Sequence, residues 1–410
     1  MGTKRIRFIA LAALLLCCGL AVSGCGDRAE LPEKGFVMGV GIDDAGSGQV
    51  LVTFQIYKPS QTVASRGKSG TPYINVRTKD TSVMEAIRDV TIHLGRKAQF
   101  SHTRVILVSE KIARKIPVPQ LLDIFYRDNE PRLTITLMIT KGNASDYFDQ
   151  RPFIENTVSQ QYYLSERSEN YFSGKTIGTN LLQLALQLRG ESRVGAIPYL
   201  ALDERITGSE PGVAGLAIIK DGLVTDRFSG QETEGLLMLM SRYTNGIVEI
   251  PCARGGSSGG GEEADAEEDD GVPLDEAAEM LQFDSHRTVA FGKDGVKVRY
   301  RIRTVVANLE LSCTKLGNER LEQAYEDKIS AAIRQQMMSA MTRLRQEKAD
   351  LIGIGNEIYK RDPRLWRKWK PDWPERFAKL DCEIEVETVI ATHGTEIGNT
   401  LLQPIQDERK

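Results

Sequence analysis

A cysteine that follows three small or apolar residues closes the N-terminal apolar segment, and its thiol has the clearest chemistry in this chain. Val22-Ser23-Gly24-Cys25 has the four-residue pattern of a bacterial lipobox. Three basic residues precede an apolar run of 15 residues, from Phe8 to Val22, which is the organisation of a signal peptide. We therefore predict that residues 1–24 are a lipoprotein signal peptide and that Cys25 becomes the lipidated N-terminus.

Lipidation of Cys25 predicts where the protein resides. The cysteine would carry a diacylglyceryl thioether, often with an added N-acyl chain. Each CH₂ buried in the membrane contributes about 0.8 kcal/mol of binding free energy, so two long chains are enough for stable anchoring. The expected location is the outer face of the cytoplasmic membrane. The alternatives are a membrane-spanning anchor or an ordinary cleaved secretory signal. The run of 15 residues is shorter than the roughly 18 that a spanning helix requires.

The remaining cysteines and the histidines have no spacing that predicts a metal centre. Cys252, Cys313 and Cys382 are the cysteines left beside Cys25 once the signal is removed, and they form no CxxC or Cys/His pattern. Because three is an odd number, we expect them to be small buried hydrophobic residues instead of a disulfide framework. The four histidines lack HExxH or HxxH spacing. No metal or cofactor is therefore expected.

No motif of a known catalytic class is present in the sequence. Gly-x-Ser-x-Gly and the Walker A pattern are absent, and no Rossmann GxGxxG occurs between a strand and a helix. Gly39-Val40-Gly41 lies inside a strand pattern, where close backbone packing is the expected reason for glycine. Pairs of carboxylates in a sequence do not indicate acid–base catalysis unless their geometry is known. The sequence therefore predicts a protein that is not an enzyme.

Charge is distributed unevenly along the chain. Without its signal the chain has 50 basic and 56 acidic residues, a net charge of −6. Nine of the acidic residues lie between Glu262 and Glu276 with no basic residue among them. This run follows a glycine-rich stretch, so we expect residues 255–276 to be a solvated, disordered insertion. The sequence has no polybasic face of the kind that would indicate nucleic acid binding.

Hydrophobic periodicity predicts an α+β protein of more than one domain, with mixed or antiparallel sheets each flanked by helices. A capping residue, Ser82, precedes one amphipathic helix. We expect an N-terminal α+β region at 25–205 and a C-terminal α+β domain at 206–400. The expected strands are 36–43, 50–58, 105–108, 133–139, 213–219, 223–226 and 246–251, and the expected helices begin near residues 82, 120, 156, 180 and 230.

Two segments of the C-terminal domain carry mirror-image charge patterns. Residues 296–304 alternate apolar residues with Lys297, Arg299, Arg301 and Arg303, and residues 383–388 alternate apolar or threonine residues with glutamates. Because opposite charges on neighbouring strands attract and like charges repel, we expect these strands to share a sheet. The alternative is that the basic row contacts anionic lipid or the acidic insertion.

A long helix and a tryptophan cluster complete the C-terminal domain. The apolar stripe from Leu321 to Leu344 predicts a helix over about 318–348, which either packs on a sheet or docks on a partner's helix. All three tryptophans lie between 366 and 373 amid basic residues. We expect Trp366 and Trp373 in the core, whereas Trp369 has two open interpretations: core packing, or a membrane or partner contact.

Several short motifs follow the lipobox in a fixed order along the chain. Gly39-Val40-Gly41-Ile42-Asp43 comes first, and HTRVILV at 102–108 and RDNEPR at 127–132 follow. AIIKDGL at 217–223, DLIGIG at 350–355 and DPRLW at 362–366 lie in the second half. In this order the motifs resemble the Ger(x)C family, the C-subunit lipoproteins of bacterial spore germinant receptors. The resemblance spans nearly the whole chain after the signal.

The resemblance implies a lipid-anchored subunit of a germinant receptor on the spore inner membrane. It implies partners, an A-type membrane subunit and a permease-like B-type subunit, and no catalysis or cofactor. Apart from the lipidated cysteine, which matches Cys25, no ligand residue transfers to this chain. The alternative from another class is a solute-binding lipoprotein of a transporter, which requires two α/β lobes around a cleft. The third alternative is a cell-envelope hydrolase, but the sequence has no nucleophile or metal motif of such an enzyme.

Overall fold

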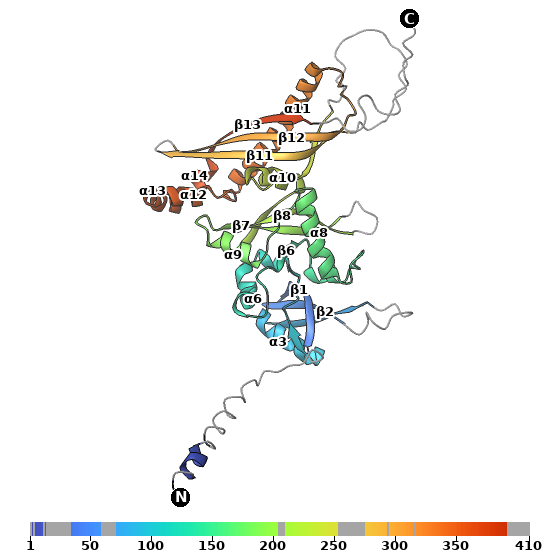
Figure 1. The fold of residues 1–410 in the computed structure, drawn as a ribbon, viewed down its shortest axis with the longest axis vertical. Coiled ribbons are helices and arrows are strands. Elements are labelled where there is room, and N and C mark those ends of the chain that lie inside the picture. The colour runs from blue at the N-terminus through green and yellow to red at the C-terminus, as the bar shows by residue number, and fades with distance from the viewer. Residues whose placement is uncertain are drawn as a thin grey trace.

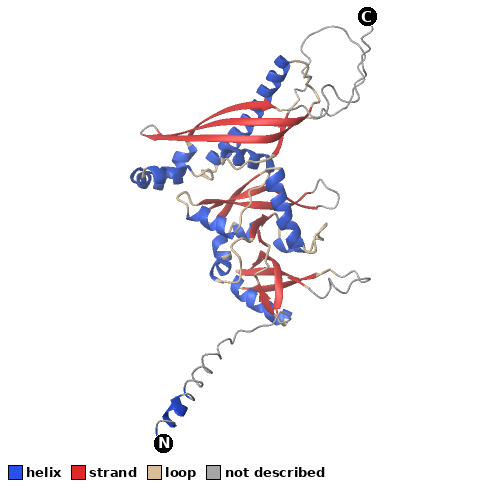
Figure 2. Cartoon of the chain, in the orientation of Figure 1, coloured by secondary structure: helices blue, strands red, loops and turns tan. Residues whose placement is uncertain are grey.

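The computed structural model describes residues 2, 5–10, 13, 34–58, 71–203, 210–252, 275–292, 295–314 and 316–391. The molecule is elongated, with one mixed sheet nearer the N-terminal end and a second sheet at the opposite end (Figure 1). Helices cover the sheets along their length (Figure 2). Among the described residues, no helix is both long and apolar enough to cross a bilayer. The α+β class predicted from the sequence is confirmed.

The first sheet has nine strands and mixes parallel with antiparallel pairing. Its order is β3-β2-β1-β5-β6-β7-β8-β9, and β4 pairs with β1 beside this path. Pairing is antiparallel at both ends and parallel from β1 through β7. The strands are β1 Lys34–Gly46, β2 Gln49–Tyr57, β3 Tyr73–Asp80, β4 Lys97–Gln99, β5 Val105–Ser109, β6 Thr136–Thr140, β7 Val194–Asp203, β8 Glu210–Lys220 and β9 Leu223–Phe228.

Helices connect the parallel strands and cover both faces of this sheet, since parallel neighbours require crossover connections. Ser82 caps the first of them by accepting a hydrogen bond from the backbone N–H of Glu85. One apolar cluster on each face forms the core. The helices are α3 Val83–Leu94, α4 Glu110–Ala113, α5 Val118–Leu121, α6 Asp123–Arg127, α7 Ala144–Phe148, α8 Val158–Phe172 and α9 Leu181–Arg189.

Gly39 and Gly41 of β1 allow helices to pack directly on the strand. A Cβ atom at Gly39 would lie 2.2 Å from Ser159 Oγ, and one at Gly41 would lie 3.0 Å from the ring of Phe148. Asp43, on the same strand, accepts hydrogen bonds from the first backbone N–H groups of α7. Close packing, and not ligand binding, therefore accounts for Gly39-Val40-Gly41, as the sequence predicted.

The second sheet has four strands in the order β10-β11-β12-β13. The long helix α11 packs beside β13 and on α10, and its buried residues join the largest core cluster (Figure 1). The strands are β10 Gly246–Ile250, β11 Glu276–Gly292, β12 Gly295–Glu310 and β13 Asp381–Ile390. The helices are α10 Gly230–Leu239, α11 Glu319–Gln346, α12 Ile354–Arg361, α13 Pro363–Trp369 and α14 Trp373–Ala378, with a short 3₁₀ turn Lys370–Asp372.

The charged rows of β12 and β13 lie side by side, which confirms the prediction that these strands share a sheet. The strands are parallel, and Arg299 lies opposite Glu383, Arg301 opposite Glu385 and Arg303 opposite Glu387. Each pair is within ion-pair distance, from 2.8 Å for Arg299 and Glu383 to 3.5 Å for Arg301 and Glu385. The basic row is thus paired within the sheet.

Hydrogen bonding continues across the boundary expected at residue 205. β8 and β9, which we expected to open the C-terminal domain, extend the first sheet: β8 pairs with β7, and β9 pairs with β8. Leu216, Ile218 and Phe228 nevertheless pack into the same core cluster as the C-terminal helices. These strands therefore belong to the first sheet by pairing and to the C-terminal core by packing. The division of the chain into domains at 25–205 and 206–400 stays a prediction.

Candidate functional site

The lipidation site predicted at Cys25 lies outside the described residues, so it stays a prediction. The first described strand, β1, begins at Lys34, nine residues after Cys25. A lipid on Cys25 would therefore tether the end of the molecule that carries β1, and the second sheet lies at the opposite end (Figure 1).

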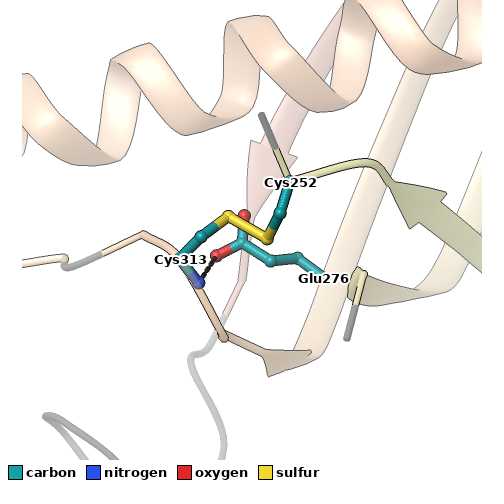
Figure 3. A group of neighbouring side chains, drawn as sticks. All are labelled: Cys252, Glu276 and Cys313. Carbon is teal, nitrogen blue, oxygen red and sulfur yellow. Dashed lines mark hydrogen bonds between the residues drawn. A yellow bond between two sulfur atoms is a disulfide. The ribbon is translucent and has the colours of Figure 1, made fainter. Parts of the chain in front are cut away.

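The prediction about the cysteines was wrong for two of them. Cys252 and Cys313 form a disulfide with a Cα–Cα distance of 6.0 Å (Figure 3). Cys252 follows β10 and Cys313 follows β12, so the sheet brings together two residues that are 61 positions apart. An odd number of cysteines permits one disulfide and one free thiol, and Cys382 is that free, half-buried thiol.

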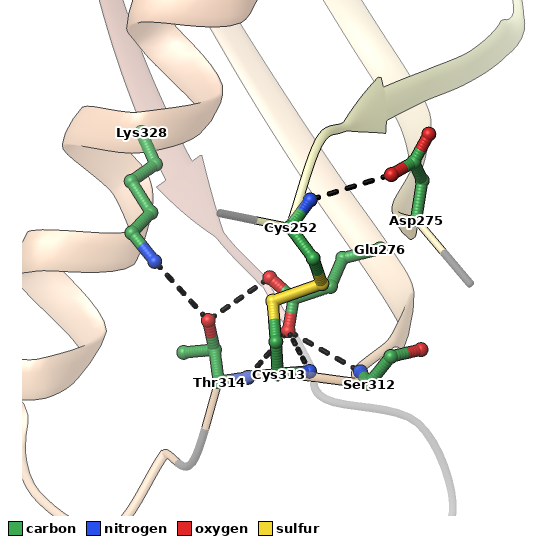
Figure 4. Close-up of a disulfide and its surroundings, with 7 residues drawn as sticks. All are labelled: Cys252, Asp275, Glu276, Ser312, Cys313, Thr314 and Lys328. Atoms are coloured by element: carbon green, nitrogen blue, oxygen red, sulfur yellow. Dashed lines mark hydrogen bonds between the residues drawn. A yellow bond between two sulfur atoms is a disulfide. The ribbon is translucent and has the colours of Figure 1, made fainter. Parts of the chain in front are cut away.

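Glu276 lies beside the disulfide and is almost fully buried, at 1% exposure. Its Oε1 accepts hydrogen bonds from the backbone N–H groups of Ser312, Cys313 and Thr314 at 3.2, 2.9 and 2.6 Å, and its Oε2 accepts one from Thr314 Oγ1 at 2.9 Å (Figure 4). Four donors compensate for the burial of this carboxylate. The expected insertion 255–276 is therefore wrong at its end, because Glu276 is the first residue of β11.

The disulfide and Glu276 together hold the two ends of the acidic segment, which we define as residues 253–274. Cys252 is the last described residue before it, and the backbone N–H of Cys252 donates to Asp275 Oδ1, directly after it (Figure 4). The two Sγ atoms and a carboxylate oxygen lie within 4.8 Å of one another. With the sulfurs bonded to each other and both carboxylate oxygens accepting hydrogen bonds, the group is a structural crosslink and provides no open metal ligand.

The sequence contained a signal for this crosslink that spacing rules do not use. Cys252 directly follows the strand expected at 246–251, and Cys313 is the ninth residue after the alternating segment 296–304. Two cysteines that each follow a strand of one sheet can meet at one edge if the strands run in compatible directions. Strand order decides this, and strand order is not encoded in cysteine spacing.

Two other buried carboxylates lie where the first sheet's helices meet the C-terminal helices. Burial raises the pKa of Glu234 on α10 to about 7, and burial raises the pKa of Glu166 on α8 to about 7. Gln336 of α11 donates to Glu234 Oε2, and Lys175 Nζ lies 3.8 Å from Glu234 Oε1. Among the described residues, Oε1 of each glutamate has no hydrogen-bond partner. These carboxylates are poorly compensated, unlike Glu276.

The tryptophans belong to the core, which confirms the expectation for Trp366 and Trp373. Trp366 donates from Nε1 to Glu191 Oε2 at 2.7 Å, and Trp373 donates from Nε1 to Asp350 Oδ2 at 3.1 Å. Trp369 is 8% exposed, and the Arg376 guanidinium lies 4.8 Å from the centre of its ring. The core interpretation of Trp369 therefore holds. Glu191 precedes β7, so Trp366 also links the two halves of the chain.

Comparison with known proteins places this chain in a family. Residues 27–202 match the model described as "Spore germination protein N-terminal domain", and residues 214–394 match "Spore germination B3/ GerAC like, C-terminal". The two matches follow one another over nearly all the chain after the expected signal. The chain belongs to the Ger(x)C family of spore germination proteins.

Relatives of this Ger(x)C protein match it over almost their entire lengths. "Spore germination protein B3" of Bacillus subtilis is 25% identical, with 92% of this chain and 96% of that protein covered. "Spore germination protein A3" of the same organism is 26% identical, with 93% and 97% covered. The crystal structure of the GerBC protein shares the fold, with a TM-score of 0.55, 19% identity, and 89% of this chain and all of that chain covered.

Proposed function

We propose that this chain is the lipid-anchored, non-catalytic subunit of a spore germinant receptor, needed for nutrient-triggered germination. The observation that carries the proposal is the succession of both family matches along one chain with a lipobox. Full-length similarity to two Bacillus subtilis spore germination proteins supports the same role. The proposed partners are an A-type membrane subunit and a permease-like B-type subunit.

The proposed location is the outer face of the cytoplasmic membrane, which becomes the spore inner membrane. The lipobox at Cys25 supports it, because a lipobox directs acylation after export. The Cys252–Cys313 disulfide supports it independently, since disulfides persist in oxidising compartments and are rare in the cytosol. Anchoring confines the subunit to the plane of its membrane partners and thereby raises their effective concentration.

A non-catalytic role fits what the described residues offer. The three histidines among them, His93, His102 and His286, are exposed and lie on separate segments. The disulfide bond occupies the two thiols that are nearest to a carboxylate. The alternative of a solute-binding lipoprotein requires two α/β lobes, whereas here one mixed sheet of nine strands is followed by a sheet of four.

The deciding experiment is nutrient-triggered release of dipicolinic acid from spores. Wild-type spores are compared with spores that lack this protein and with spores that carry Cys25→Ala, across a panel of amino acids and sugars. We expect both mutants to lose the response to one class of nutrient, because an unanchored subunit is diluted away from its partners. A normal response in both mutants, in a strain without redundant receptors, would refute the proposal.

A further inference from the structure

An apolar groove with an acidic rim opens between the end of α8 and the outer face of the second sheet. Its volume is about 460 Å³, and its lining includes Tyr171 and Phe172 of α8, Ile247 of β10, Ala277 of β11 and Glu310 of β12. The groove therefore joins the two parts of the chain that the family models match separately. No lysine or arginine is among the described residues that line it.

Three large apolar or aromatic side chains that line the groove are exposed to solvent. Phe172, Tyr171 and Ile247 are 68%, 58% and 57% exposed, and the two aromatic rings contact each other edge to face with centroids 4.8 Å apart. Contiguous exposed apolar surface marks interaction sites, and aromatic residues dominate the binding energy of interfaces. Val248 and Ile250, the neighbours that point to the other face of β10, are buried in the core.

Local structure holds the aromatic pair in place. α8 ends at Phe172, and Gly174 follows with φ of +65°, a left-handed conformation that lets the chain turn back sharply. The Gly174 N–H donates to the carbonyl of Glu169 in the last turn of the helix. A Cβ atom on Gly246 would lie 3.0 Å from the Ser173 carbonyl oxygen, so β10 passes close to this turn. The groove is thus preformed, which lowers the entropy lost on binding.

The electric field around the groove favours a cationic occupant. Glu279 and Glu310 both line the groove, and no lysine or arginine of the described chain does. The segment between Cys252 and Asp275 carries seven acidic residues and one arginine in the sequence. Complementary charge accelerates encounter and selects partners. The acidic segment itself is unsuited to the groove, because its charge has the same sign as the rim.

We propose that this groove is a docking site for a partner segment that combines apolar or aromatic side chains with lysine or arginine. The apolar side chains of that segment pack on Tyr171, Phe172 and Ile247, and its cationic groups pair with Glu310 on the rim. Because the groove includes residues from both halves of the chain, a bound segment contacts both halves and stabilises their arrangement.

The test uses the mature chain, residues 25–410 with Cys25→Ser, so that neither acyl chains nor detergent are present. Both family matches and the described fold begin after residue 25. The probes are a fluorescein-labelled peptide of alternating lysine and leucine and a matched peptide with glutamate in place of lysine, followed by fluorescence anisotropy. We expect only the cationic peptide to bind. Equal binding of the two peptides, or of neither, overturns the proposal.

Substitutions locate the binding. Phe172→Ser should weaken binding of the cationic peptide by about tenfold, the usual loss for an aromatic anchor. Glu310→Lys should weaken binding and reduce its salt dependence. Ile92→Ser is the matched control, because Ile92 on α3 is exposed and apolar but distant from the groove. All three positions are exposed, so the variants keep the fold, which thermal melts verify. Binding by Phe172→Ser at the wild-type affinity overturns the proposal.

The chain's own C-terminal segment, residues 392–410, is the competing occupant, because it contains apolar residues and ends in Arg409 and Lys410. Truncation after Ala391 tests it. Unchanged peptide affinity supports a partner segment, whereas a gain in affinity assigns the groove to the chain's own terminus and overturns the proposal. All these measurements use purified protein, so their failure leaves the receptor role, tested in spores, unaffected.

Discussion

Two buried clusters of the C-terminal half, one around Glu276 and one around Glu234, differ in how well hydrogen bonds compensate the burial of the carboxylate. Glu276 accepts four hydrogen bonds beside a disulfide, whereas Glu234 has one hydrogen bond, from Gln336, and a lysine at 3.8 Å. Both are at most 3% exposed. Compensation, and not burial alone, therefore decides whether a buried charge stabilises the fold.

The difference follows from the location of the two clusters. The Glu276 cluster is built at the end of the second sheet, where the pairing of Ala277 with Glu310 brings residues 312–314 beside Glu276. The Glu234 cluster and Glu166 lie where α8, α10 and α11 meet, and their uncompensated oxygens favour protonation. We infer that the end of the second sheet around Glu276 is rigid. The contact between the two halves, around Glu166 and Glu234, is sensitive to pH.

The largest expected effect is the loss of the crosslink. Cys252→Ser should lower the free energy of unfolding by about 4 kcal/mol in the chain-entropy model, because the disulfide closes a loop of 61 residues. Urea unfolding with and without reductant measures it. Cys382→Ser is the control, since that thiol is unpaired: the variant keeps the disulfide and should lose stability in reductant as the wild type does. Equal stability of Cys252→Ser and the reduced and oxidised wild type would contradict a structural role for the bond.

The next effect tests the compensated carboxylate. Glu276→Ala leaves the backbone N–H groups of residues 312–314 without their acceptor and should destabilise the protein by about 3 kcal/mol. Glu387→Ala, at an exposed position of the same sheet, is the matched control. Thermal unfolding of the two variants provides the comparison, and a similar melting temperature for both would show that Glu276 is not stabilising.

The uncompensated carboxylates predict a dependence of stability on pH. Glu166 and Glu234 titrate near pH 7 in the fold and near 4.5 in the unfolded chain, so the folded state binds more protons between these values. Stability should therefore be highest at low pH within this window and fall as the pH rises towards 7, by on the order of 2 kcal/mol per carboxyl.

Neutral variants test the assignment of this pH dependence. Glu234→Gln and Glu166→Gln should each flatten the profile of unfolding free energy between pH 5 and pH 8, because the amide does not titrate. If the slope is the same in the wild type, in Glu234→Gln and in Glu166→Gln, other groups cause the pH dependence. The proposed difference between the Glu276 and Glu234 clusters is then wrong.

The smallest effect concerns the exposed charge ladder. Arg301 and Glu385 are 67% and 65% exposed at the side chain, so water and salt screen their attraction. Arg301→Glu should produce a slight destabilisation that vanishes at high salt, and the double variant Arg301→Glu with Glu385→Arg should restore the wild-type value. A double-mutant cycle on thermal stability measures it, and a large salt-independent loss would show that the ladder has a further role.

Local patterns were sufficient for much of the fold. The alternation in residues 296–304 and 383–388 predicted both the strands and their pairing, because the charge rows left one favourable neighbour. The stripe from Leu321 to Leu344 predicted α11, since a helical period is visible in sequence. In contrast, β11 was not predicted: its residues, from Glu276 to Gly292, alternate poorly, and pairing with two neighbours creates the strand.

The sequence by itself determined the family, the α+β class, the two strands of alternating charge and the long helix, and it predicts the lipid anchor at Cys25, because each of these depends on residues close together in the chain. Only the tertiary structure decided the Cys252–Cys313 disulfide, the burial of Glu276, and the groove between Phe172 and Glu310. The physical reason is that each of these joins segments separated by tens of residues or more, and strand order and helix packing place them together.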